Sequence, residues 1–194
     1  MTVVFDFVDP GSYLVQEILY PWEEDPDQAD RRVNWLPLEL RPPPSELISP
    51  DEAGWAALLQ AMKEEATRLD LPFSPPDFVP WTRKAHELVF HLREVESDSA
   101  ARQMIHRIFR AYFQDGLDLG RVDILVSLVD AAGFDAAEAR TVLGVDRFQE
   151  AVEGARSEAL ERDFRGVPTL LLGNSRRLEG YHGPEELNAF LADQ

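Results

Sequence analysis

Strand-type patterns occur only near the two ends of this chain, and a long helical pattern separates them. Residues 3–8 form a run of β-branched and aromatic side chains that is typical of a buried strand. Residues 34–40 have the same character, and Pro37 indicates an edge or interrupted strand. Residues 166–180 predict two strands joined by a tight Gly-Asn-Ser turn, which is a β-hairpin. Because the two ends cannot bury their strands separately, we expect one core interrupted by a helical insertion.

Helical periodicity describes most of the remaining sequence. A helix is expected from Ser12 to Pro21, after the first strand. Residues 49–52, Ser-Pro-Asp-Glu, have the pattern of a capping box with proline at the first helical position, and predict a long helix from there. It opens a block of roughly five helices, and a terminal helix starts at residues 183–186. The predicted order is β-α-β, the helical block, then β-β-α, an α/β class.

The chain is strongly acidic, with 36 Asp and Glu against 19 Lys and Arg and a net charge of -17. This charge disfavours nucleic acid and anionic membranes as partners. The acidic run from Glu23 to Asp30 lacks the spacing of a calcium loop, and we expect a solvated loop there. The first residues contain no basic leader or long apolar run, so we expect a cytoplasmic protein. The oligomeric state stays open, with a homodimer among the alternatives.

The chain contains no cysteine. Structural disulfides, zinc-thiolate sites, iron-sulfur clusters and thiol nucleophiles all require a sulfur that this sequence lacks. His86 and His91 lie five residues apart, so their side chains point to different sides of a helix, and we expect no metal site there.

The element order, together with three stretches of sequence, resembles the thioredoxin fold with the helical insertion of DsbA-like disulfide oxidoreductases, particularly the FrnE-type branch. Residues 4–14 lie where that family has a strand, Cys-Pro-x-Cys and then a tyrosine. Residues 81–86 and 109–113 resemble the insertion of this branch, and residues 166–169 its cis-proline loop. The resemblance implies a discontinuous thioredoxin-like domain, residues 1–48 and 164–194, and an inserted helical domain, residues 49–163.

The cysteine positions of that motif correspond here to Asp9 and Ser12, with Pro10 and Gly11 between them. A carboxylate or a hydroxyl cannot exchange with a disulfide, so the chain alone cannot carry out dithiol-disulfide chemistry. The resemblance then implies a protein that keeps the groove for a peptide or a small thiol ligand. The candidate ligand-binding residues are Pro10, Gly11, Tyr13, Val167 and Pro168.

Kappa-class glutathione transferases and 2-hydroxychromene-2-carboxylate isomerases are similar to the same fold, and imply an alternative. They replace the first cysteine with a serine that assists the thiolate of glutathione, which makes glutathione the candidate cofactor. In this chain Asp9 occupies that position, where its negative charge would oppose a thiolate. Ser12 and Asp9 are the candidate catalytic residues of this alternative.

Two of these residues have competing interpretations. Asp9 followed by Pro10 has the pattern of a helix N-cap, and a general base or ligand contact is the alternative role. The bond from Val167 to Pro168 is expected to be cis on the resemblance, and to pack against residues 9–12. The exposed amide and carbonyl groups of Val167 would then pair with a peptide or with the backbone of glutathione.

Overall fold

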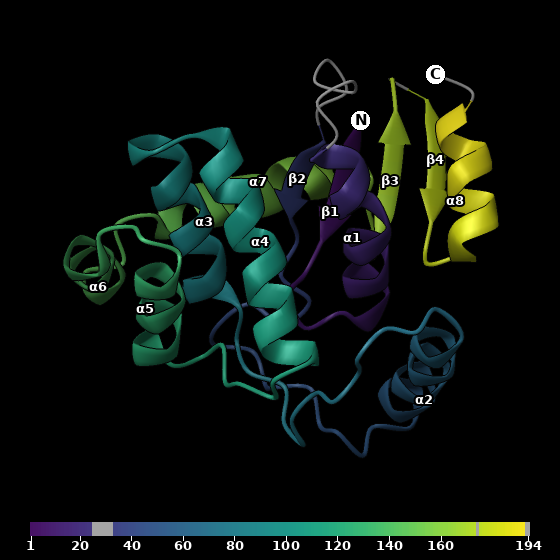
Figure 1. The fold of residues 1–194 in the computed structure, drawn as a ribbon, viewed down its shortest axis with the longest axis horizontal. Helices are drawn as coiled ribbons and strands as arrows, with labels where there is room; N and C mark the ends of the chain where they lie inside the picture. The colour runs from purple at the N-terminus through teal and green to yellow at the C-terminus, as the bar shows by residue number, and fades with distance from the viewer. Residues whose placement is uncertain (25–32, 174, 193–194) are drawn as a thin grey trace.

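The computed structural model describes residues 1–24, 33–173 and 175–192, and these residues form a four-stranded sheet (Figure 1). The strand order is β2-β1-β3-β4. Strand β1 pairs in parallel with β2 and antiparallel with β3, and β3 pairs antiparallel with β4. The strands are β1 Thr2–Phe5, β2 Asn34–Pro37, β3 Thr169–Leu172 and β4 Arg176–Glu179. The predicted hairpin and the edge position of the proline-containing strand are confirmed.

Both strands of the N-terminal region are shorter than predicted. Phe7 and Val8 follow β1 in a turn that the Asp9 N–H closes by donating to the carbonyl of Asp6 at 3.1 Å. Their side chains are nevertheless buried, at 0% and 2% exposure. The apolar run therefore marks burial, and only its first half is paired as a strand.

Eight helices complete the described part of the chain, and six of them form the insertion for which roughly five were expected. They are α1 Pro10–Glu23, α2 Ala53–Arg68, α3 Arg83–Val95, α4 Asp98–Phe113, α5 Val122–Ala131, α6 Ala136–Gly144, α7 Gln149–Glu161 and α8 Gly183–Ala192. The division into two domains remains a prediction.

Two predicted helix boundaries are wrong. The expected capping box does not form, because the N–H of Glu52 donates to the carbonyl of Ser49 at 3.0 Å in a turn, and α2 begins only at Ala53. The first helix does not end at Pro21. It continues through this proline to Glu23.

The sheet is covered on both faces, and the side chains of β1 alternate between them. Val3 and Phe5 belong to the main core, which includes side chains of α1, α3 and α4. Val4 belongs to a second cluster that includes Ala155 and Ala159 of α7. Figure 1 shows α1 and α7 on opposite sides of the sheet, and α2 below the strands. Within the described residues, no helix is long and apolar enough to cross a membrane.

The predicted acidic loop lies mostly outside the described residues, which omit residues 25–32. Its first member, Glu23, is not solvated as expected. The Glu23 side chain is only 3% exposed. Both of its carboxylate oxygens accept from Trp35 Nε1, at 3.2 and 3.4 Å. Burial raises the pKa of Glu23 to about 7.

Candidate functional site

The first turn of α1 is the centre of the candidate site. Asp9 is the N-cap of this helix, and its Oδ2 accepts from the backbone N–H of Ser12 at 2.5 Å. Pro10 occupies the first turn, where a missing N–H costs no hydrogen bond. The cap predicted from the sequence is therefore present, whatever further role Asp9 has.

The peptide bond between Val167 and Pro168 is cis, as predicted. Pro168 packs directly on the first turn of α1: a Cβ placed on Gly11 would lie 2.9 Å from Pro168 Cδ and 3.3 Å from Asp9 Oδ2. A separation of 2.9 Å is too short for a real side-chain contact. Only glycine at position 11 therefore permits Pro168 to pack this closely on the first turn of α1. The structure thus brings together residues that are more than 150 positions apart in the sequence.

The carboxyl group of Asp9 is buried, at 3% exposure. Burial raises its pKa to about 7, and the nearby charge of Asp6 adds to this increase. The hydrogen bond from Ser12 acts in the opposite direction but is outweighed. Asp9 therefore changes protonation near neutral pH, at the position of the first family cysteine.

Ser12 is fully buried, and its hydroxyl oxygen makes no hydrogen bond of good geometry among the described residues, although this side chain lies close enough to Asp9 to lower the pKa of that carboxyl group. Tyr13 is also fully buried, but its hydroxyl group is already paired away from Pro168. It donates to the carbonyl of Pro72 at 2.8 Å, and Gln114 Nε2 donates to it at 3.0 Å. In this structure Tyr13 joins α1 to the inserted helices.

Asp6 anchors the turn that leads into the site. Its Oδ2 accepts from the backbone N–H of Leu40 at 2.7 Å, and its Oδ1 lies 3.2 Å from Nε2 of His86. Among the described residues no group of three His, Cys, Asp or Glu side chains is placed to hold a metal ion.

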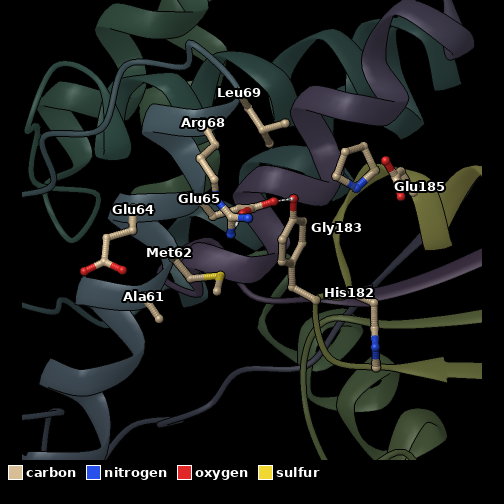
Figure 2. Close-up of a pocket in the computed structure, with 11 residues that line it drawn as sticks. Ala61, Met62, Glu64, Glu65, Arg68, Leu69, His182, Gly183 and Glu185 are labelled. Carbon is tan, nitrogen blue, oxygen red and sulfur yellow. Dashed lines mark hydrogen bonds and ion pairs between the residues drawn. The ribbon is translucent and has the colours of Figure 1, made fainter.

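Tyr181 lies against Gly11, and no sequence pattern had pointed to it. Its Cβ would lie 3.3 Å from a Cβ on Gly11, and its hydroxyl group donates to Glu65 Oε1 at 2.8 Å (Figure 2). Arg68 forms an ion pair with the same glutamate. Tyr181 and its partner Glu65 are 116 positions apart, so only the fold reveals the contact. The one local signal is the pair of glycines, Gly180 and Gly183, that flank the tyrosine with positive φ.

A cavity of about 650 Å³ lies beside Tyr181, between α2 and the segment that leads into α8 (Figure 2). The cavity includes both apolar and charged side chains. Its lining is Ala61, Met62, Glu64, Glu65, Arg68, Leu69, Tyr181, His182, Gly183, Pro184 and Glu185. A cleft was expected where residues 9–12, residues 167–168 and the inserted helices meet. This cavity does lie against an inserted helix, α2, but residues 9–12 and 167–168 do not line it, and Tyr181 contacts both places.

The whole chain matches a known family. The model of the DSBA-like thioredoxin domain matches residues 1–192, and the chain belongs to this family. Among curated proteins it is 28% identical to the uncharacterized protein YwbO from Bacillus subtilis (strain 168), over 99% of this chain and 95% of that protein.

Several solved structures share the fold. A probable DsbA oxidoreductase, SCO1869, from Streptomyces coelicolor is 19% identical, with a TM-score of 0.79 over 100% of this chain and 90% of that one. A 2-hydroxychromene-2-carboxylate isomerase is 17% identical, with a TM-score of 0.78 over 99% of this chain and 92% of that one. At these identities the likeness extends to the fold alone.

Proposed function

We propose that this chain is a DsbA-like protein that acts without redox chemistry and binds a peptide or a small thiol ligand beside Pro168. The observation that carries the proposal is the packing of Pro168 on the Asp9–Ser12 turn, at a distance only glycine allows at position 11. The scaffold of the family's reactive site is thus retained in a chain without cysteine. The cytoplasmic location expected from the sequence belongs to the same proposal.

The backbone of Val167 supports ligand binding. This residue is half-buried, and within the described residues its N–H and carbonyl groups make no hydrogen bond. An extended ligand backbone can supply both partners, in the manner of an added β-strand. Recognition would then depend on the ligand's peptide groups rather than on its thiol.

The neighbouring cavity supports the same function, because it offers room beyond the backbone contact. Its volume of about 650 Å³ is in the range of small-molecule sites. Met62 and Leu69 provide apolar surface, and Glu64 and Glu185 provide carboxylates. Side chains of a bound peptide would lie in this cavity, next to Tyr181.

Calorimetric titration tests the proposal with two matched ligands, reduced glutathione and γ-glutamyl-seryl-glycine, which differ only in the thiol. We expect both to bind, with dissociation constants of about 1 mM or lower and within about threefold of each other. Absence of binding by both ligands at 10-fold higher concentration, about 10 mM, would overturn the proposal.

A second function, an enzyme of the glutathione transferase or isomerase kind, is favoured by the pKa of Asp9. A carboxyl group with a pKa of about 7 is partly neutral at physiological pH, which weakens its repulsion of a thiolate and suits it to proton transfer. In this function Ser12 would contact the thiol. Glutathione binding at least tenfold tighter than that of the serine analogue, together with turnover abolished by Asp9→Asn, would support the enzyme over the binding protein.

A further inference from the structure

A second cavity, of about 430 Å³, lies between α1, α4 and α5 and away from the residues described above. Two arginines, Arg107 and Arg110, line it from adjacent turns of α4. Its other lining residues are Tyr20, Gln103, His106, Asp115 and Leu128.

Neither arginine forms an ion pair within the described residues, although the charge of Arg110 opposes the increase that burial causes in the pKa of Glu17. Arg107 has no ion pair there, and the Nε of Arg110 donates at 3.0 Å to the uncharged side chain of Gln114. Arg102, earlier on the same helix, does pair with a carboxylate, that of Glu23. In a chain with 36 acidic and 19 basic residues, two neighbouring guanidinium groups without such partners leave positive charge available to an external anion.

The rings of His106 and Tyr20 line this cavity and stack on each other. Their centroids are 3.7 Å apart, and the interplanar angle is 3°. His106 Nδ1 lies 3.0 Å from the Oε1 of Gln16, an acceptor, so Nδ1 carries the proton and Nε2 is left as an acceptor. Burial, together with the positive charges of Arg110 and Arg107, lowers the pKa of His106 to about 4. The imidazole is therefore neutral at pH 7 and reports on the charge of the two arginines.

Two carboxylates limit which anions can bind. Asp115 lines the cavity, and Glu17 Oε1 lies 3.6 Å from Nδ1 of His106. For a ligand with a single negative charge, the repulsion by these two carboxylates offsets much of the attraction to the arginines. A phosphate group carries nearly two charges and presents several acceptor oxygens, which match two forked guanidinium groups.

We propose that this cavity binds a small phosphate ester, with the phosphate held by Arg107 and Arg110. The cavity is several times larger than a phosphate ion, whose volume is on the order of 50 to 100 Å³ on the scale where one water occupies about 30 Å³. The remaining space, beside Tyr20 and Leu128, receives the organic part of the ester. This site is independent of the proposed function at Pro168.

Two phosphate probes, inorganic phosphate and phenyl phosphate, test the site in the full chain at constant ionic strength. Calorimetry measures binding, and the ring-proton signals of the histidines in NMR spectra measure the pKa of His106. We expect saturable binding of both probes and tighter binding of phenyl phosphate, because its ring fills the apolar part of the cavity. The pKa of His106 should rise when phosphate cancels the charge of the arginines.

The matched variants are Arg107→Gln, Arg110→Gln and, as control, Arg140→Gln. Arg140 is exposed on α6 and has no ion pair among the described residues, so its replacement changes the net charge equally at a distant place. We expect each of the first two variants to bind phenyl phosphate at least tenfold more weakly and the control to bind as the parent does. Circular dichroism verifies that each variant is folded.

Three results would overturn the proposal. The first is no saturable binding of phenyl phosphate at about 10 mM, a concentration that detects even weak sites. The second is an equal loss of affinity in the Arg140→Gln control, which would indicate a general charge effect. The third is binding that leaves the pKa of His106 unchanged, which would place the ligand elsewhere.

Discussion

The buried carboxyl group of Asp9 predicts a specific dependence of stability on pH. Its pKa is raised from 3.8 to about 7 in the folded chain, chiefly by burial. Between these two values the folded state binds a proton that the unfolded state has already released. The free energy of unfolding therefore falls as pH rises through this window. Asp9 is 3% exposed, so solvent does little to screen this effect.

Asp9→Asn removes the titration while keeping a side chain that can cap α1. A shift of about three pKa units corresponds to about 4 kcal/mol, at about 1.4 kcal/mol for each unit. We expect the variant to differ little from the parent near pH 4, where Asp9 is protonated in the folded state. Near pH 8 the variant should have gained about 4 kcal/mol relative to the parent.

Urea unfolding of both proteins at pH 4, 6 and 8 measures this difference. Glu23 and Glu39 also have raised pKa values, of about 7 and about 6, so the parent loses stability with pH for several reasons. The difference between parent and variant isolates Asp9, because the other groups are common to both. A difference that stays constant from pH 4 to pH 8 would refute the reasoning.

Two further substitutions test the packing around the site. Gly11→Ala should lower the free energy of unfolding by about 1 to 3 kcal/mol, because the new Cβ would lie 2.9 Å from Pro168 Cδ. Gly154→Ala, in the interior of α7, places a new Cβ with no atom within 4 Å apart from its chain neighbours and the backbone of its own helix, and should instead stabilise the protein by about 0.5 to 1 kcal/mol. Urea unfolding measures both variants, and an equal change in the free energy of unfolding would contradict the close contact between Gly11 and Pro168. Tyr181→Phe should cost about 1 to 3 kcal/mol, because Glu65 loses its hydrogen bond in a buried position; an unchanged unfolding midpoint would show that this bond contributes nothing.

Local patterns predicted the parts of the site that depend on neighbouring residues. Asp9 and Pro10 are adjacent, so their N-cap arrangement could be inferred from the sequence. The resemblance to the DsbA-like family added the cis bond before Pro168 and its packing on the first turn of α1. The N-cap was inferred from a rule about neighbouring residues, and the cis bond from a feature that the family shares.

Contacts across the chain could not be predicted in this way. Glu23 belongs to an acidic run that predicts a solvated loop, yet Trp35 binds its carboxylate in a buried place. Tyr181 lies between two glycines with no motif of its own, and only the position of α2 brings it to Glu65. Residues 49–52 have the composition of a capping box, but they form a turn, since composition alone does not fix where a helix starts.

Backbone amide shifts in NMR spectra, followed during titration with reduced glutathione and its serine analogue, test the central claim most directly. The proposed function predicts saturable shifts at Gly11, Ser12, Val167 and Tyr181 with both ligands, and no chemical change in either. Absence of shifts at these four residues at about 10 mM ligand, or shifts confined to other parts of the chain, would contradict the claim that the groove beside Pro168 is a binding site.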